Sequence, residues 1–146
     1  MMDSRDGQVH PWLAESWEQT DTNIWRVTLR EGLKFSNGAP LDADAVLATL
    51  AFLKSADAQA FRVAGEFTKV DSARALDPRT IEFRLHAADP LFPRTLALLT
   101  VLEPAQLKSR GIAGFAQAPI GSGPYKLERW ETSRAVFTAN PYAWVK

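Results

Sequence analysis

The segment Gly121-Ser122-Gly123 is the stretch of this sequence whose residue types most suggest chemistry. A phosphate-binding loop needs a Lys-Ser/Thr pair or a third glycine at the start of a helix, but here Pro124 follows at once and the next residues alternate like a strand. A nucleophile turn of the form G-x-S-x-G also fails, because Ser122 has glycine on each side. We therefore interpret the segment as a structural turn: a close-packed bend with positive φ that returns the chain to its sheet.

The histidines and paired carboxylates do not form a convincing reactive site either. His10 and His86 are the two histidines, and neither has another ligand at metal-binding spacing on an obvious shared face. Asp42 and Asp44 fit helix capping and the positive end of a helix dipole better than a catalytic pair. No local pattern supports a Ser-His-Asp triad. We predict no catalytic residue, no metal, no cofactor and no enzymatic activity.

The elements that position these residues follow from hydrophobic periodicity. A main helix begins after Asp42 and carries an apolar stripe through Leu53. Alternation of apolar and polar residues predicts strands. The predicted strands are residues 24–30, 70–76, 81–86 and 125–128, with Trp17 and Val136 on further arms, and the predicted short helices are 93–99 and 104–110. The fold class is therefore α+β, a mostly antiparallel sheet of five or six strands with one main helix and short helices on a face.

Composition excludes several classes of function. With 46% hydrophobic and 23% charged residues, the 146-residue chain is typical of a folded globular domain. Seventeen basic and 17 acidic residues cancel, so the electrostatic footprint of a nucleic-acid binder is missing. No apolar run approaches the roughly 18 residues of a membrane span. The first ten residues contain no apolar signal core, so an export signal, if there is one, is expected outside this chain.

Three groups of motifs, in order, resemble one protein family. The first group comprises Pro11–Trp17 (PWLAESW), Trp25–Arg30 (WRVTLR) and Lys34–Val46 (KFSNGAPLDADAV), and the others are Pro119–Leu127 (PIGSGPYKL) and Ala139–Trp144 (ANPYAW). Together they are similar to motifs of the family 5 extracellular solute-binding proteins. These are peptide- and nickel-binding receptors of ABC importers.

The resemblance implies a location, partners and a larger architecture. Family members are two-lobed type II (cluster C) periplasmic-binding proteins, and residues 1–146 look like a single partial domain of the first lobe: its inserted subdomain plus edges. The implied partners are a small peptide or similar solute and a membrane ABC permease. The implied location is periplasmic or extracellular, lipid-anchored or soluble in the full-length protein. Faces left bare in such a fragment make self-association possible.

The resemblance also implies which residues bind the ligand. It places Phe61, with Arg62 beside it, near the ligand, although a core position for Phe61 is equally compatible with the residues 55–66. A second cleft-edge strip is Leu99, Thr100 and Val101. In nickel receptors of this family the strip is arginine-rich, whereas here it has no arginine, which favours peptides over a metal chelate. The alternatives are a nickel-chelate receptor and a ligand-sensing module fused to a regulator.

Overall fold

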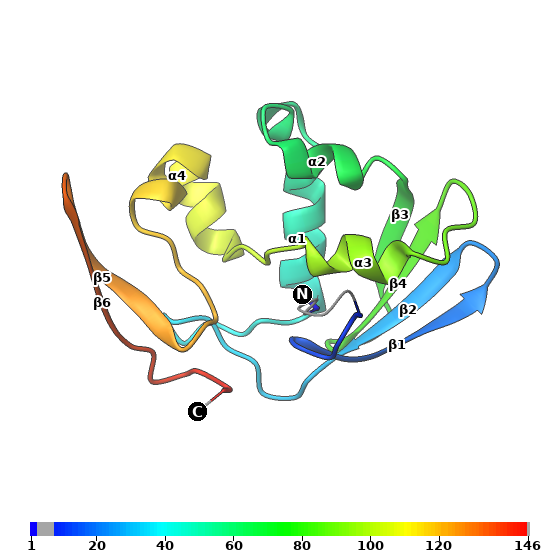
Figure 1. Cartoon of the computed structure of the whole chain (residues 1–146), viewed down its shortest axis with the longest axis horizontal. Coiled ribbons are helices and arrows are strands. Elements are labelled where there is room, and N and C mark those ends of the chain that lie inside the picture. The colour runs from blue at the N-terminus through cyan, green and yellow to red at the C-terminus, as the bar shows by residue number, and fades with distance from the viewer. Residues whose placement is uncertain (3–7, 146) are drawn as a thin grey trace. The chain divides into compact units, whose positions relative to one another are not determined.

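The structure is a computed structural model that describes residues 1–2 and 8–145 (Figure 1). The chain forms two compact units. Unit 1 comprises the described residues of Met1–Glu31 and Asp42–Val101, and unit 2 comprises those of Gly32–Leu41 and Leu102 onward. Each unit therefore contains two separate stretches of the sequence, and the short segment Gly32–Leu41 interrupts unit 1.

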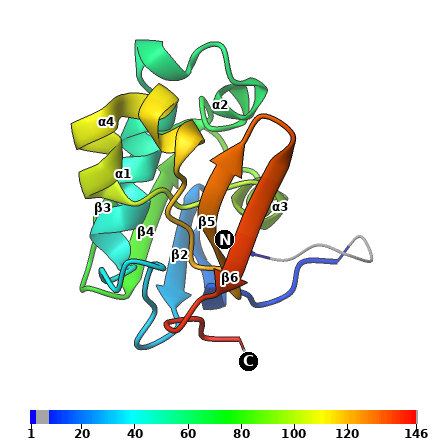
Figure 2. The ribbon, with the colours of Figure 1, turned by 90° about the vertical axis from the view of Figure 1, so that its left-hand side faces the viewer.

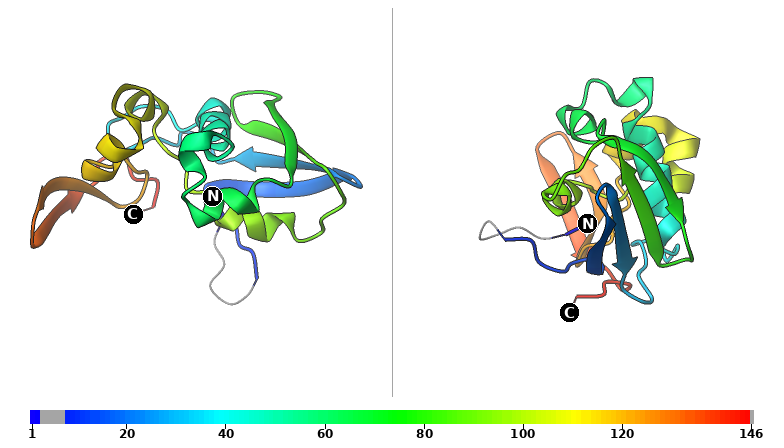
Figure 3. Two further views of the ribbon diagram at one scale, coloured as in Figure 1. Left: turned by 90° about the horizontal axis from the view of Figure 1, so that it is seen from above. Right: turned by 90° about the vertical axis from the view of Figure 1, so that its right-hand side faces the viewer.

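Unit 1 is built on a four-stranded antiparallel sheet (Figures 1 and 3). The strands are β1 (Ala14–Asp21), β2 (Ile24–Leu29), β3 (Val70–Ala75) and β4 (Thr80–Leu85), in the spatial order β1-β2-β4-β3. The predicted strands at 24–30, 70–76 and 81–86 are confirmed within one residue at each end. Two hairpins are thus joined by pairing β2 with β4, with Val27 opposite Ile81.

The core of unit 1 lies on one face of this sheet. Alternate residues of β2 and β4 are buried, among them Val27, Ile81 and Phe83, as expected for strands with one covered face. The helical elements of unit 1 are α1 (Ala43–Leu53), η1 (Ala56–Ala58), α2 (Arg62–Glu66) and α3 (Phe92–Ala97). Phe92 of α3 packs edge-on against Phe83, with 5.5 Å between the ring centroids.

Local side-chain hydrogen bonds fix the ends of these elements. Asp42 is the N-cap of α1, and its Oδ1 accepts from the Ala45 N–H at 3.1 Å, which confirms the predicted cap. Asp77 Oδ1 accepts from the backbone N–H groups of Arg79 and Thr80 at 2.8 and 2.9 Å in the turn between β3 and β4. The Pro78 carbonyl of this turn accepts from the Ala43 N–H at 2.8 Å, so the turn also holds the start of α1.

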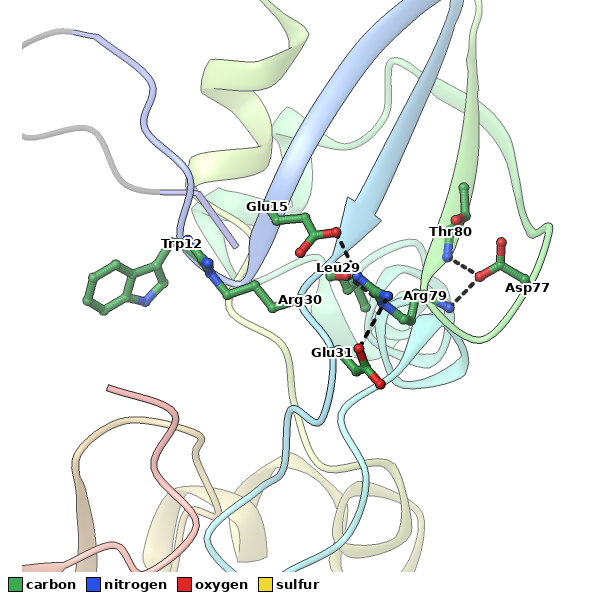
Figure 4. Close-up of polar contacts among 8 residues, drawn as sticks. All are labelled: Trp12, Glu15, Leu29, Arg30, Glu31, Asp77, Arg79 and Thr80. Carbon is green, nitrogen blue, oxygen red and sulfur yellow. Dashed lines mark hydrogen bonds and ion pairs between the residues drawn. The ribbon is translucent and has the colours of Figure 1, made fainter. Parts of the chain in front are cut away.

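Arg79 links the same turn to the first hairpin (Figure 4). Its Nε donates to the Leu29 carbonyl at 2.9 Å, and its Nη2 lies 2.6 Å from Glu15 Oε1. Glu31 lies at 4.0 Å from Nη1 of the same guanidinium. One side chain therefore ties β1, β2 and the β3–β4 turn together through charge-assisted hydrogen bonds.

Unit 2 contains one kinked helix and one hairpin. Helix α4 (Pro104–Gln117) breaks its helical backbone at Gly111, where φ is 63°. The predicted helix end before Gly111 therefore marks a kink, and helix resumes beyond it. Strands β5 (Tyr125–Glu131) and β6 (Arg134–Ala139) lie side by side as an antiparallel pair (Figure 2).

The prediction of one sheet with five or six strands is wrong. The described residues form a four-stranded sheet and a separate two-stranded sheet. Period-two alternation identifies a strand by the faces of its side chains, but it carries no information about which backbone edges pair. The hairpin β5–β6 therefore looked like part of the first sheet although it belongs to the other unit.

The prediction of a close-packed, positive-φ bend at Gly121-Ser122-Gly123 is confirmed only in part: the chain bends at Gly123 and Pro124, but the glycines have no positive φ and are not close-packed. Among the described glycines, positive φ occurs at Gly32, Gly38 and Gly111, and a Cβ added at Gly121 or Gly123 would meet no atom within 4 Å. At Gly123 the ring of Pro124 restricts the backbone of the residue before it, which favours a negative φ. The positive φ of 86° at Gly38 instead confirms the tight turn predicted from Asn37-Gly38.

Candidate functional site

The candidate binding surface of unit 1 begins at Phe61 and Arg62. Phe61 is the N-cap of α2 and is 41% exposed, with its ring 6.2 Å from the Phe52 ring at the end of α1. Arg62 is the first residue of α2 and is exposed, with no ion-pair partner among the described residues. The structure thus shows an aromatic ring and a free guanidinium side by side in sequence at the start of one short helix.

A pocket of about 390 Å³ lies beside Arg62. Its other lining residues are Val63 and Glu66, from the same helix, and Leu98, which follows α3. Leu98 is 52% exposed, so it presents an apolar side chain next to the charged one. The pocket therefore combines a cation, a carboxylate and an apolar wall, a mixture suited to holding a small polar ligand by non-covalent contacts.

The second predicted strip is only partly exposed. Leu99 is fully buried, and Val101 is 6% exposed, so both have the burial of core residues, whereas Thr100 between them is exposed. The Leu99 carbonyl accepts a hydrogen bond of 2.6 Å from the Met1 ammonium, and burial lowers the pKa of that ammonium to about 6. Within the strip, Thr100 is therefore the side chain best placed to meet a ligand.

Lys69 and Asp89 hold the start of α3, which carries Leu98 at its C-cap. Lys69 Nζ lies 2.9 Å from Asp89 Oδ2 and 3.2 Å from Thr95 Oγ1. Burial raises the pKa of Asp89, but the hydrogen bonds from Lys69 and the Leu91 N–H outweigh it and keep this pKa below its ordinary value. The carboxylate thus stays charged and keeps α3 anchored at neutral pH.

Sequence reasoning missed the neighbours that complete the pocket. Leu98 adjoins the predicted strip, but its exposure could not be predicted, because no sequence pattern distinguishes it from the buried Leu99. Val63 and Glu66 lie on a five-residue helix, which is too short to show a hydrophobic period. Phe61 and Arg62 were predicted from the sequence, and Arg62 lies in the same pocket as Leu98.

Groups that would support other chemistry do not gather in this part of the chain. Among the described residues no three His, Cys, Asp or Glu side chains lie close enough together to hold a metal ion. No helix within that same part is long and apolar enough to cross a membrane. The candidate surface of unit 1 combines an aromatic ring, a cation and an apolar wall.

Comparison with known proteins identifies the family. The model of the bacterial extracellular solute-binding proteins, family 5 (Middle), matches residues 8–146. The chain belongs to this family. The resemblance seen in the motifs is confirmed, and with it the α+β class with an antiparallel sheet and few helices. The family consists of solute-binding proteins, in agreement with the prediction that the chain is not an enzyme.

Individual relatives show how much of a longer protein the chain matches. It is 34% identical over 146 residues to the nickel-binding periplasmic protein of Escherichia coli K12, which is 95% of this chain and 27% of that protein. It is 30% identical over 131 residues to the HTH-type transcriptional regulator SgrR of Salmonella choleraesuis, which is 88% of this chain and 22% of the regulator. The chain therefore spans about a quarter of the length of these relatives.

A solved structure gives the same relationship in three dimensions. The oligopeptide-binding protein AppA of Bacillus subtilis, in complex with a nonapeptide, superposes with a TM-score of 0.82 at 26% identity. The superposition covers 95% of this chain and 29% of AppA. The fold of these 146 residues is therefore that of one part of a solute-binding protein.

Proposed function

We propose that the chain is part of the substrate-binding component of an ABC importer and that it contributes to binding peptides or similar small solutes. The observation that carries this proposal is the family match, which covers residues 8–146. The chain would correspond to a partial domain, the inserted subdomain plus edges of the first lobe. The matched region supports this assignment, because it covers only 27% of the length of the E. coli protein.

Phe61, Arg62 and Thr100 would contact the solute from this part of the protein. The Arg62 guanidinium can pair with a carboxylate, such as a peptide C-terminus, through two parallel hydrogen bonds. Phe61 and Leu98 would supply apolar contact to side chains, and Thr100 a hydroxyl. Leu99 and Val101 would act from the core, by holding Leu98 and Thr100 at the surface. Binding by this part alone should be weak, because a second lobe must close on the solute.

The proposal includes a cellular setting. The full protein would work in the periplasm or outside the cell, lipid-anchored or soluble, and would deliver its solute to an ABC permease in the membrane. Relatives named as periplasmic binding proteins support this location. Nothing in the net charge of zero favours a nucleic acid as a partner.

Thermal unfolding with di- to pentapeptides at millimolar concentration tests the proposed site. A ligand at a hundred times its Kd stabilises a protein by about 2.7 kcal/mol, so an engaged pocket gives a measurable shift. Arg62→Gln and Phe61→Ala should abolish the shift, and Arg84→Gln, an exposed cation on β4 outside the pocket, should leave it unchanged. A shift that survives in both site variants would contradict the assignment of these residues. A cooperative transition that peptides do not move would mean that recognition depends on the rest of the protein.

Two alternatives rest on specific similarities. The match to SgrR favours a sensing module in which the same fold is joined to a regulator. The 34% identity to a nickel-binding protein favours a nickel chelate as the solute. Titration with Ni(II)-histidine beside the peptides separates the solutes, since the lack of arginine in the strip 99–101 predicts preference for peptides. A DNA-binding domain in the same gene would identify the sensor.

A further inference from the structure

Two neighbouring residues of unit 2 have the chemistry to react with each other. Asn37 is followed by Gly38, and it is the one asparagine of the sequence that precedes a glycine. Asn23 precedes an isoleucine, whose β-branched side chain crowds its own backbone nitrogen. Asn140 precedes a proline, whose nitrogen carries no hydrogen. The backbone nitrogen of Gly38 is therefore the least hindered nucleophile beside an asparagine side chain in this chain.

The reaction is an internal displacement of ammonia. The Gly38 nitrogen gives its proton to a solvent base and attacks Cγ of Asn37, so that a new C–N bond closes a cyclic imide. The bond between Cγ and Nδ2 then breaks, and the side-chain nitrogen takes up a proton and leaves as ammonia. Water opens the ring at either of its two carbonyl carbons, which gives aspartate or its isomer isoaspartate. The net change converts an asparagine and a water molecule into a carboxylic acid and ammonia, with no change of oxidation state.

The folded turn engages both reacting groups in hydrogen bonds. Residues 35–38 form a β-turn in which the Gly38 N–H donates to the Phe35 carbonyl at 2.9 Å. The Asn37 Oδ1 accepts from the Ala39 N–H at 3.0 Å, which holds the side-chain amide in place. Asn37 is itself exposed, so water and base can reach it. The attack must wait until the bond from Gly38 to Phe35 breaks, because that bond uses the hydrogen that the nitrogen has to lose.

Packing within unit 2 holds this turn closed. Phe35 is fully buried, and the Ser36 N–H donates to the Gly121 carbonyl at 2.7 Å. Gly38 has a φ of 86°, and a Cβ added there would lie 3.1 Å from the Tyr142 ring. The turn is thus fixed from both sides, by a bond to a distant part of unit 2 and by an aromatic ring. Release of the Gly38 N–H therefore requires a local opening of unit 2.

We propose that Asn37 is a site of spontaneous deamidation and isomerisation whose rate is set by the opening of this turn. The turn closes faster than the imide forms, so the observed rate equals the intrinsic rate multiplied by the fraction of open turn. The closed turn protects Asn37, and each opening exposes it to reaction. This modification is independent of the solute site proposed around Phe61 and Arg62.

The products fit the closed turn less well than asparagine does. Isoaspartate moves a methylene group into the main chain, and so it lengthens the segment spanned by the 2.9 Å bond from the Phe35 N–H to the Ala39 carbonyl. Either product adds a negative charge at position 37, which lines a groove of about 980 Å³ together with the buried Glu103 carboxylate. Like charges in one groove repel. The converted turn is therefore less stable, and the fraction converted records how long unit 2 has been open.

The experiment is incubation of the 146-residue chain in mildly alkaline buffer, followed by peptide mapping that separates asparagine, aspartate and isoaspartate. The chain is incubated both folded and unfolded in urea. We expect conversion at Asn37 to be at least tenfold slower in the folded chain, with Asn23 and Asn140 converting far more slowly than Asn37 in urea. Equal rates at Asn37 in the two states would overturn the proposal. An Asn37 that stays intact in urea would overturn it as well.

Variants separate the opening of the turn from the intrinsic chemistry. Tyr142→Ala removes the ring beside Gly38 and should speed conversion of the folded chain severalfold, with Gly38 amide exchange rising by the same factor. Tyr125→Ala removes the other tyrosine, which lies outside the turn, and should leave both rates unchanged. In urea both variants should convert at the rate of the unsubstituted chain. Asn37→Gln should convert far more slowly in every condition, because its longer side chain must close a larger ring.

A series of the unsubstituted chain in urea below its unfolding transition gives the same test without a substitution. Conversion of Asn37 and exchange of the Gly38 amide should rise in proportion along the series. A conversion rate that does not change while Gly38 exchange rises would overturn control by the turn. An unchanged conversion rate in a folded Tyr142→Ala chain would overturn the role given to the aromatic ring.

Discussion

The two sheets of this chain differ in what covers them. In β2 and β4 every second residue is buried, whereas no residue of β5 or β6 is. Both sheets show apolar alternation in the sequence. The helices and loops of unit 1 supply the cover for its sheet, with Phe92 against Phe83 as one contact. An amphipathic strand has one apolar and one polar face, and its stability depends on whether another layer covers the apolar face.

Aromatic truncation in each sheet gives the largest expected contrast. Phe83 is fully buried and Phe137 is 56% exposed. We expect Phe83→Ala to lower the free energy of unfolding by about 3–5 kcal/mol, because it leaves a cavity beside Phe92. Phe137→Ala should cost less than about 1 kcal/mol, because little packing is lost. Urea denaturation of both variants measures this, and similar losses would mean that the hairpin face is covered in solution.

Two glycines of unit 2, Gly38 and Gly123, differ in backbone conformation and should differ in how well they tolerate substitution. Gly38 has a φ of 86°, and a Cβ there would lie 3.1 Å from the Tyr142 ring. We expect Gly38→Ala to destabilise by more than about 1 kcal/mol. Gly123→Ala should be neutral or slightly stabilising, because Gly123 lacks a positive φ and its Cβ would meet nothing. Thermal melts of the two variants decide this, and a loss at Gly123 as large as at Gly38 would refute it.

The N-cap of α1, a helix that covers the first sheet, should contribute moderately to the free energy of unfolding. Asp42→Ala removes the acceptor of the Ala45 N–H and should cost about 1 kcal/mol. Asp44 lies in the first turn of the same helix but makes no capping bond, so Asp44→Ala should cost only about 0.3 kcal/mol. Chemical denaturation of both variants is the measurement. Equal losses would show that the charge, not the cap, holds the helix start.

The carboxylate of Asp77 should make the stability of unit 1 depend slightly on pH in acid. Hydrogen bonds from the Arg79 N–H and from Thr80 lower the pKa of Asp77 below its ordinary 3.8. A lowered folded-state pKa means that the carboxylate stabilises the fold above pH 3.8 and that this contribution fades as the pH falls through the folded-state pKa. Between about pH 4 and pH 2, the free energy of unfolding of the Asp77→Asn variant should depend less on pH than that of the Asp57→Asn variant. The same slope in both variants would argue against this role.

Sequence reasoning found most elements because each was specified locally. Asp42 and Asn37-Gly38 are short-range signals, and the structure confirms both the cap and the turn. The strands of unit 1 were found because the alternation of Trp25, Val27 and Leu29 coincides with true burial. Where the physics lies within a few residues, the sequence is sufficient to predict it.

What could not be predicted depends on partners distant in the chain. The pairing of β2 with β4 joins residues more than fifty positions apart, and nothing in the alternation assigns an edge to it. The exposure of Leu98 beside the buried Leu99 likewise depends on the surrounding fold. The positive φ at Gly123 was mispredicted because the effect of Pro124 on the preceding residue outweighs the freedom of glycine.

Amide hydrogen exchange of the 146-residue chain tests the contrast between the two sheets most directly. The amides of β2 and β4 should exchange only through global unfolding, while those of β5 and β6 should exchange through local opening of much lower free energy. Equal protection of both sheets in the free chain would contradict the conclusion that the hairpin lacks its cover.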